Sequence, residues 1–202
     1  MGGEHGCIYC YARPSHAYLG LSPGLDFETQ LIARPQAPDV LRRELRAKGY
    51  LPQTIAIGTN TNPYQPIERD RKLLRGLLQV LSEFDHSVAI ITKGALITRD
   101  IDILGPMAAK GLVRVGISIT TLDPATSRVM EPRVPLPAVR LRAIRELTDA
   151  VIDVRVMVSP VLPAVTDHEL EVILQAAAQA GAKAASSIVL RLPREVSGLF
   201  RN

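Results

Sequence analysis

Short apolar runs alternate along the chain with longer segments in which apolar residues recur at helical spacing. The apolar runs predict five strands, at residues 54–58, 87–92, 113–120, 154–158 and 184–190. The helically spaced segments predict helices at residues 67–84, 101–110, 135–150 and 166–181. Thr166 and Glu169 have the spacing of a capping box at the start of the last helix, and Gly181 is its predicted C-cap.

The predicted strands indicate the fold class. They are continuous apolar runs, which is typical of strands that are covered on both faces. Because they recur through helices, we expect them to be parallel, and the fold class is α/β. No G-x-G-x-x-G motif follows any of these strands in the sequence, so the dinucleotide-binding fingerprint is absent from it. The pattern alone leaves open whether the sheet is doubly wound or forms a barrel.

Polar residues directly follow four of the predicted strands. They are the Gly-Thr-Asn-Thr-Asn run at 58–62, the segments 92–94 and 118–121, and the pair Ser159 and Pro160. Each has an ordinary explanation as a turn, a solvated lysine or a helix N-cap. The carboxyl ends of parallel strands, however, meet on one side of a sheet and line one mouth of a barrel. Together, these four ends favour a cofactor site in a barrel.

The composition is that of one globular domain. The 202 residues are 47% hydrophobic and 22% charged. The sequence has neither an apolar stretch of eighteen residues nor a basic start followed by an apolar region. It therefore predicts a single domain over residues 1–202, in the cytoplasm, with no membrane span and no signal peptide.

The charge is mildly basic. A net charge of +4 and a pI of about 9.3 permit an anionic substrate without requiring one. Solvated helix faces are the simpler interpretation of the arginines in the predicted helices, namely Arg69, Arg71, Arg75, Arg140, Arg142 and Arg145. The sequence has no basic stripe with interleaved aromatic residues, which a nucleic-acid platform would need.

Both cysteines of the chain, Cys7 and Cys10, lie near its start and are separated by two residues. In a reducing compartment this spacing favours metal ligands or redox groups over a structural disulfide. A complete metal site needs three or four ligands, so two thiols alone leave the kind of site open.

Longer stretches of the sequence resemble the radical S-adenosylmethionine (radical SAM) enzymes, in particular an uncharacterised branch related to spore photoproduct lyase. Residues 2–14 read Gly-Gly-Glu-His-Gly-Cys-Ile-Tyr-Cys-Tyr-Ala-Arg-Pro, where the family typically has cysteine at the second of these positions. Residues 58–66, 91–93, 115–120 and 130–133 are also similar to the family. The resemblance covers nearly the whole chain.

The resemblance implies a partial (β/α)6 barrel of parallel strands, similar to a TIM barrel, with a [4Fe-4S] cluster on a C-x3-C-x2-C loop. It implies that S-adenosylmethionine binds the open iron and is cleaved to a 5′-deoxyadenosyl radical, which abstracts hydrogen from a substrate. The substrate is unknown, and a nucleic acid is conceivable. The implied electron donor is a protein such as a flavodoxin or ferredoxin.

The resemblance also assigns roles near the cysteines. Cys7 and Cys10 match the second and third cluster ligands, and Tyr9 matches an aromatic residue that packs near the adenine. Glu131 and Arg133 match a later family motif, and we expect them to order the site. The hydrogen-donor cysteine of the photoproduct enzyme has no counterpart in the sequence, which disfavours direct repair of that lesion.

Four further residues match contacts to S-adenosylmethionine. Thr59 and Asn60 match polar contacts to the methionine amino group. Lys93 matches a contact to the carboxylate, and Ser118 matches a contact to the ribose. The resemblance thus predicts a cofactor site that joins the cysteine loop to three strand ends.

Gly3 occupies the place of the first cluster cysteine, and glycine has no side-chain donor. A cluster held by two thiolates is expected to be labile, unless His5, His16 or an outside thiol substitutes. In the family, a first strand precedes the cysteine loop and a further segment follows the last strand. We therefore expect this chain to lack both parts and to have an unpaired apolar sheet edge that favours self-association.

Three hypotheses for the function follow. The first is a radical SAM enzyme with a [4Fe-4S] cluster and S-adenosylmethionine. The second is a non-catalytic remnant that has lost the cluster. The third is a zinc-linked binding module in which two chains each donate Cys7 and Cys10 to one tetrahedral site.

Overall fold

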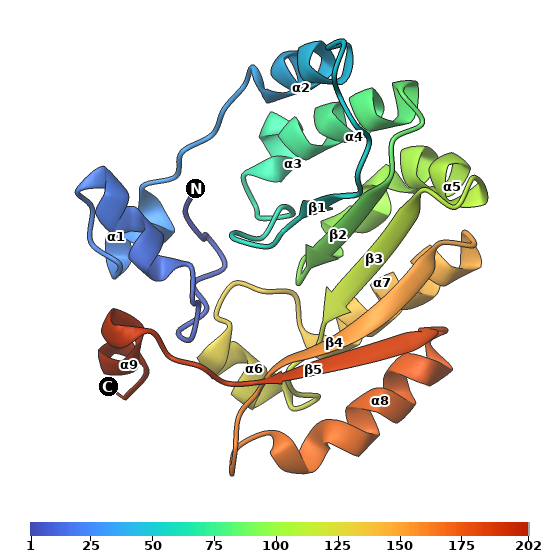
Figure 1. The fold of residues 1–202 in the computed structure, drawn as a ribbon. Helices are drawn as coiled ribbons and strands as arrows, with labels where there is room; N and C mark the ends of the chain where they lie inside the picture. The colour runs from blue at the N-terminus through green and yellow to red at the C-terminus, as the bar shows by residue number, and fades with distance from the viewer. Residues whose placement is uncertain (202) are drawn as a thin grey trace.

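Five strands form one parallel sheet in the computed structural model, which describes residues 1–201 (Figure 1). The strands are β1 (Ile55–Ile57), β2 (Val88–Thr92), β3 (Val113–Ser118), β4 (Asp153–Val161) and β5 (Ala184–Val189). Each strand pairs in parallel with the next, in the order β1-β2-β3-β4-β5, so that β1 and β5 form the edges. The predicted α/β class and the five predicted strands are confirmed.

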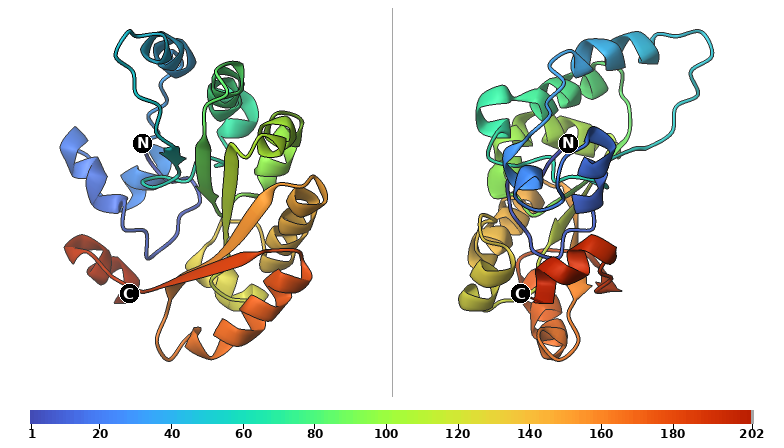
Figure 2. Two further views of the ribbon diagram at one scale, coloured as in Figure 1. Left: turned by 45° about the vertical axis from the view of Figure 1, so that its right-hand side comes forward. Right: turned by 90° about the vertical axis from the view of Figure 1, so that its left-hand side faces the viewer.

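Four helices cover one face of this sheet (Figures 1 and 2). They are α4 (Leu73–Glu83), α5 (Ile101–Ala109), α7 (Pro137–Asp149) and α8 (Leu170–Gln179). The three central strands contribute alternate apolar side chains to the buried core, namely Val88, Ile90, Val113, Val115, Ile117, Val154, Val156 and Val158. Burial of each such side chain contributes roughly 1.5–3 kcal/mol, so this layer is the main source of stability.

The opposite face of the sheet differs from the expectation of strands buried on both sides. Within residues 1–201 no helix covers it, and the sheet curves around it like part of a barrel wall (Figure 2). The strand register places Arg114, Gly116, Arg155 and Met157 on this face. Both arginines are exposed, whereas Gly116 is buried beneath Met157. The inner face is therefore partly open.

The helix predicted at 67–84 is two helices in the structure, α3 (Glu68–Arg71) and α4. Lys72 separates them in the left-handed conformation, with φ of 50°. The reason is a side-chain cap: the Glu68 carboxylate accepts hydrogen bonds from the amides of Leu74 (3.1 Å) and Arg75 (3.3 Å). These amides lie in the first turn of α4, where they have no partner within the helix.

The other predicted helices are confirmed as α5, α7 and α8, but the predicted capping box at the start of α8 is wrong. The Thr166 hydroxyl accepts from the Leu162 amide (3.1 Å), and a short 3-10 helix, η3 (Asp167–Glu169), precedes α8. The Glu169 carboxylate accepts from the amide of Leu122, at 2.6 Å. Gly181 follows α8 with a φ of 103°, as predicted for a C-cap glycine.

The sequence pattern did not predict several short elements. They are the 3-10 helices η1 (Arg13–Leu19) and η2 (Ala95–Asp100), and the helices α1 (Leu25–Thr29), α2 (Ala37–Leu45), α6 (Pro124–Met130) and α9 (Arg194–Arg201). The segment from the N-terminus through α1 lies beside the carboxyl ends of the strands, and α9 packs against η1 on the same side (Figure 1). This arrangement encloses the space at the strand ends.

Among the helices that the structure describes, none combines the length and the apolar character that crossing a membrane requires.

Candidate functional site

A cavity of about 460 Å³ lies at the carboxyl ends of the strands, beneath the N-terminal segment. The structure brings all seven residues of the predicted cofactor site to its wall, namely Cys7, Tyr9, Cys10, Thr59, Asn60, Lys93 and Ser118. They come from the cysteine loop and from the ends of β1, β2 and β3. The juxtaposition is thus a property of the fold, whereas the role of each residue stays a prediction.

Buried Arg13 holds the cysteine loop in place. Its side chain donates hydrogen bonds to the Cys7 carbonyl (3.1 Å) and to the Glu28 carboxylate (2.6 Å). Glu28 also accepts from Arg133, which in turn donates to the Glu4 carbonyl. Arg133 therefore orders the loop from its outer side. It does not line the cavity.

Both thiols of the loop face a low-polarity environment. Cys7 is 8% exposed, and Cys10 is half-buried. Burial raises the pKa of the Cys7 thiol to about 12, and the nearby Glu131 carboxylate adds to this rise. Burial also raises the pKa of Cys10. In the metal-free protein both groups are thiols at neutral pH, and a metal would have to displace their protons.

The structure leaves no room for a third cysteine as it stands. A Cβ atom built on Gly3 would lie 2.4 Å from Cε1 of Phe27. The Phe27 ring is 1% exposed. Its centre lies 5.1 Å from the centre of the His16 ring and 5.3 Å from Cζ of the Arg13 guanidinium. A cysteine at position 3 would require this ring or the loop to shift.

Neither histidine completes a metal site. His16 is fully buried outside the cavity, and its Nε2 lies 3.1 Å from the Gln30 carbonyl oxygen. His5 lines the cavity and is neutral at pH 7, because burial, reinforced by Lys93, lowers its pKa to about 4. Its Nδ1 has no hydrogen-bond partner among the described residues, but His5 does not converge with both cysteines on one point. Within residues 1–201 no three histidine, cysteine, aspartate or glutamate side chains converge to hold a metal ion. The residues present therefore do not fit a cluster with three protein ligands.

Glu131 connects the cysteine loop to the strand ends. Its carboxylate accepts from the Tyr9 hydroxyl, and one oxygen lies 3.2 Å from Nζ of Lys93. Burial alone would raise the pKa of Glu131, but Lys93 and Arg140 outweigh it and lower the pKa to about 2. Glu131 is thus ionised at neutral pH although it is fully buried.

The interpretation of Arg140 as solvated was wrong, whereas Arg75 is partly exposed and ion-paired. The Arg140 side chain is 0% exposed and pairs with Glu131, which attracts it into the interior. Arg75 pairs with Asp100 (2.8 Å) and Asp102 (2.6 Å), both beyond its own helix. The other four helix arginines are exposed, as expected, namely Arg69, Arg71, Arg142 and Arg145. Amphipathic spacing could not identify partners on other elements.

The loop after β1 forms the opposite wall. Gly58 has a φ of +93°, and a Cβ atom there would lie 2.0 Å from the Ile91 carbonyl oxygen, so only glycine permits this turn. The turn presents Thr59 and Asn60 to the cavity. The Tyr11 hydroxyl donates to the Thr59 carbonyl and thereby links this loop to the cysteine loop.

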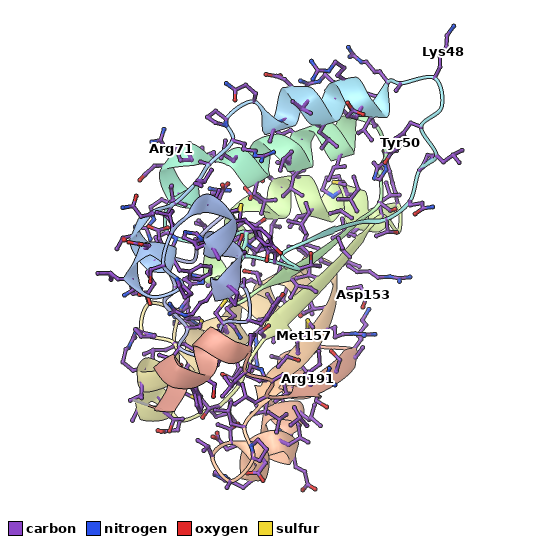
Figure 3. All side chains as sticks on the ribbon, turned by 60° about the vertical axis from the view of Figure 1, so that its left-hand side comes forward. Lys48, Tyr50, Arg71, Asp153, Met157 and Arg191 are labelled. Atoms are coloured by element: carbon purple, nitrogen blue, oxygen red, sulfur yellow. The ribbon has the colours of Figure 1, made fainter. Side chains whose placement is uncertain are left out.

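Sequence reasoning missed part of the wall. Met157 on β4 and the segment 188–191 also line the cavity, and Figure 3 shows Met157 and Arg191 near each other at this end of the sheet. A Cβ atom at Gly116 would lie 2.8 Å from the Met157 sulfur, so the glycine makes room for Met157. The glycine inside a predicted strand was a signal of such close approach.

Residues 2–177 match the family model described as the Radical SAM superfamily. An uncharacterized protein of Mycobacterium tuberculosis is 38% identical over 201 residues, covering 98% of this chain and 59% of that protein. An uncharacterized protein of Methanocaldococcus jannaschii is 25% identical over 169 residues, covering 84% of this chain and 61% of that protein. The chain thus spans about three fifths of the length of the curated relatives it matches.

Two kinds of solved structure share the fold. Spore photoproduct lyase complexed with dinucleoside spore photoproduct has a TM-score of 0.68 and 17% identity, covering 100% of this chain and 58% of that chain. SuiB of Streptococcus suis bound to S-adenosylmethionine has a TM-score of 0.58 and 17% identity, covering 81% and 35%. The five parallel strands are thus the partial barrel of these proteins, and the chain belongs to the radical SAM superfamily.

Proposed function

We propose that the cavity at the strand ends binds S-adenosylmethionine, and that the chain is an S-adenosylmethionine-binding domain of the radical SAM fold. The observation that supports this most is the convergence of seven assigned residues, from four segments of the chain, on one cavity. Its volume of about 460 Å³ lies within the roughly 300–1,000 Å³ that is typical of small-molecule sites.

The charges of the wall suit a ligand carboxylate. The Lys93 ammonium contacts a Glu131 oxygen (3.2 Å) and the Ser159 carbonyl oxygen (3.3 Å). Among the described residues these two contacts use two of its three hydrogens, so the third can bond to a ligand. Lys93 and Arg140 both pair with Glu131, which gives this group an excess of one positive charge. An ionised carboxylate at Lys93 would balance that excess.

Proteins of the same fold bind this ligand. A mutant of spore photoproduct lyase with bound AdoMet and dinucleoside spore photoproduct has a TM-score of 0.68 to this chain at 17% identity. SuiB was also solved bound to S-adenosylmethionine. The shared fold supports binding of the same ligand by this chain.

The reaction of the family also needs a [4Fe-4S] cluster, and we propose that this chain does not hold one stably through its own side chains. Cys7 and Cys10 supply two thiols, Gly3 supplies none, and the Phe27 ring fills the space in front of Gly3. Thiolates are the ligands that hold iron-sulfur cores. Formation of a 5′-deoxyadenosyl radical would therefore require a further ligand from outside the chain, such as a small thiol.

A zinc site shared by two chains fits the geometry less well. Cys7 is buried at the cavity wall, where a second chain would have to insert its own loop. The raised pKa of Cys7 further opposes the loss of its proton to zinc.

Calorimetric titration of the metal-free protein tests the binding proposal. We expect the wild type to bind S-adenosylmethionine, and we expect Lys93→Met to weaken this binding about tenfold, since a charge-assisted hydrogen bond is lost. The Lys93→Met substitution should change the affinity for 5′-methylthioadenosine, which lacks the carboxylate, by less than about twofold. Lys110→Met, at a surface ion pair with Asp85, is the control. Absence of S-adenosylmethionine binding by the wild type would refute the proposal.

Anaerobic reconstitution with iron and sulfide tests the proposed loss of the cluster. The wild type should bind well below four irons per chain, whereas Gly3→Cys combined with Phe27→Leu should bind more, because a third thiolate gains space. A wild type that binds four irons and cleaves S-adenosylmethionine after reduction would contradict the loss. Metal analysis of the purified protein before reconstitution tests the zinc-linked module, which predicts half a zinc per chain and no iron.

A further inference from the structure

A buried ionic group lies behind the wall of the cavity. It consists of Glu131 after α6, Arg140 on α7 and Lys93 after β2. The side chains of Glu131 and Arg140 are 0% exposed, and that of Lys93 is 15% exposed. Of the three, only Lys93 lines the cavity.

One oxygen of Glu131 serves three segments of the chain. Oε1 accepts from the hydroxyls of Tyr9 and Thr120, the latter at 3.1 Å, and lies 3.2 Å from Nζ of Lys93. Tyr9 and Lys93 both line the cavity, and the ammonium lies 5.4 Å from the centre of the tyrosine ring. Glu131 therefore fixes two cavity side chains relative to each other.

Arg140 fixes the carboxylate from the other side. Its guanidinium bonds to Oε2 of Glu131 and donates to the backbone carbonyls of Ser118 and Pro135, both at 2.9 Å. It also donates to the Ser127 hydroxyl, at 3.1 Å. A planar guanidinium with partners on all sides has a single orientation. The position of Glu131 is thereby tied to the end of β3.

Stability alone does not account for this group. Charges removed from water need partners, and well-packed apolar side chains of similar volume often stabilise a protein at least as much. A fully satisfied polar network in a low-dielectric interior does supply rigidity. Here the network also holds the Tyr9 hydroxyl and the Lys93 ammonium in fixed positions, because both contact Glu131.

We infer that Glu131 and Arg140 are positioning residues of the cavity, which orient the Tyr9 ring and the Lys93 ammonium toward a bound ligand and anchor the cysteine loop to the sheet. The part that concerns the ligand rests on the proposed function. The part that concerns the cysteine loop does not require any ligand.

Glu131→Asp separates position from charge, because it keeps the negative charge but shortens the side chain by one methylene. The carboxylate then cannot reach Tyr9, Lys93 and Arg140 together. In metal-free protein, we expect Cys7 and Cys10 to react about tenfold faster with 5,5′-dithiobis(2-nitrobenzoic acid), since the released loop exposes them. Affinity for S-adenosylmethionine should fall about tenfold more than affinity for 5′-methylthioadenosine, which lacks the carboxylate.

Glu68→Asp is the matched control. Glu68 is 4% exposed and binds Arg99 at 3.0 Å, but it does not line the cavity. We expect this variant to lose thermal stability like Glu131→Asp, while its thiol reaction rate and both affinities stay within about twofold of the wild type. Equal effects of the two substitutions on thiol rate and affinities would overturn the inference.

A second pair of variants applies if Glu131→Asp fails to fold. Tyr9→Phe removes only the hydroxyl that bonds Glu131, whereas Tyr18→Phe changes a tyrosine that is 91% exposed. Faster thiol reaction in Tyr9→Phe alone supports the inference, and an unchanged rate overturns it. If the wild type binds no S-adenosylmethionine but Tyr9→Phe or Glu131→Asp still accelerates the thiols, the proposed function fails and the anchoring role of Glu131 stands.

Discussion

At the scale of single residues, the site is made by neighbours that constrain one another. Glu131 stays ionised in the interior because Lys93 and Arg140 surround it, and Gly58 is required by a carbonyl oxygen on the adjacent strand. The motif that contains Glu131 was visible in the sequence, but its partners were not, since they lie on three other segments. Chemistry at this site therefore depends on contacts distant in sequence.

His5 gives a pH dependence of stability. Burial lowers its pKa from 6.5 to about 4, so the unfolded chain takes up a proton that the folded chain does not. The free energy of unfolding is therefore unaffected by His5 above pH 6.5 and falls as the pH decreases toward 4. Between pH 7 and pH 5 the loss that His5 causes should be about 2 kcal/mol.

Urea unfolding of the metal-free protein at both pH values measures this loss. His5→Gln should remove about 2 kcal/mol of the pH dependence, because glutamine does not titrate. His168→Gln, a substitution at an exposed position, is the control, and its free energy of unfolding should depend on pH as that of the wild type does. Equal pH dependence in the wild type and His5→Gln would show that His5 titrates normally in the folded protein.

At the scale of elements, a side chain cap divided one predicted helix into two. Lys72 adopts a φ of 50° at the junction, a conformation that costs a non-glycine residue roughly 1–2 kcal/mol. Lys72→Gly should therefore leave the free energy of unfolding unchanged or raise it by up to about 1 kcal/mol. Lys48→Gly, in an exposed loop at an ordinary φ, should lower it by about 0.5–1 kcal/mol, because glycine adds entropy to the unfolded chain.

Chemical denaturation of the two lysine variants measures this difference. A larger loss at Lys72 than at Lys48 would mean that the left-handed conformation carries no strain. The result would then assign the break between α3 and α4 to the Glu68 cap alone.

The elements that sequence could predict are those whose own residues determine them. The five strands are apolar runs, and the helices α5, α7 and α8 have apolar residues at helical spacing. All were predicted within four residues of their observed bounds. The capping box failed because Thr166 and Glu169 bind residues of other segments. Helices α1 and α9 are short and pack against η1, so their formation depends on contacts outside their own segments.

The convergence of Thr59, Asn60, Lys93 and Ser118 could be anticipated from topology, since parallel strands place their carboxyl ends together. The cysteine loop precedes every strand, so only the family resemblance predicted that it joins them.

The wall formed by residues 188–191 could not be anticipated, because nothing in their sequence marks them as a site. Gly116 signalled a close approach at β3, but it did not identify Met157 as the residue that approaches. Nor could the Phe27 ring in front of Gly3 be anticipated, because it depends on how α1 folds back over the loop.

At the scale of the whole molecule, the cavity lies between two parts of the chain. Side-chain hydrogen bonds such as that of Tyr9 to Glu131 join them, as does the backbone hydrogen bond from Ile8 to Met130. The N-terminal segment rests on the strand ends, and the sheet with its helices forms the other part (Figure 1). A ligand that fills the cavity contacts both parts, so its binding should suppress openings that separate them. Parts of the fold away from the cavity should not respond.

Hydrogen exchange with and without S-adenosylmethionine tests this picture of the molecule. At a ligand concentration one hundred times the dissociation constant, openings that release the ligand should slow by up to about a hundredfold. We expect slower exchange in residues 5–7, 9–11, 58–62 and 91–93, which line the cavity. Residues 37–54 are the internal control, because Lys48 and Tyr50 of this region lie well away from Met157 and Arg191 (Figure 3). Protection that appeared equally in the control region, or that spared the cysteine loop, would place the ligand elsewhere or show a general stabilisation, and the two-part enclosure of the ligand would be wrong.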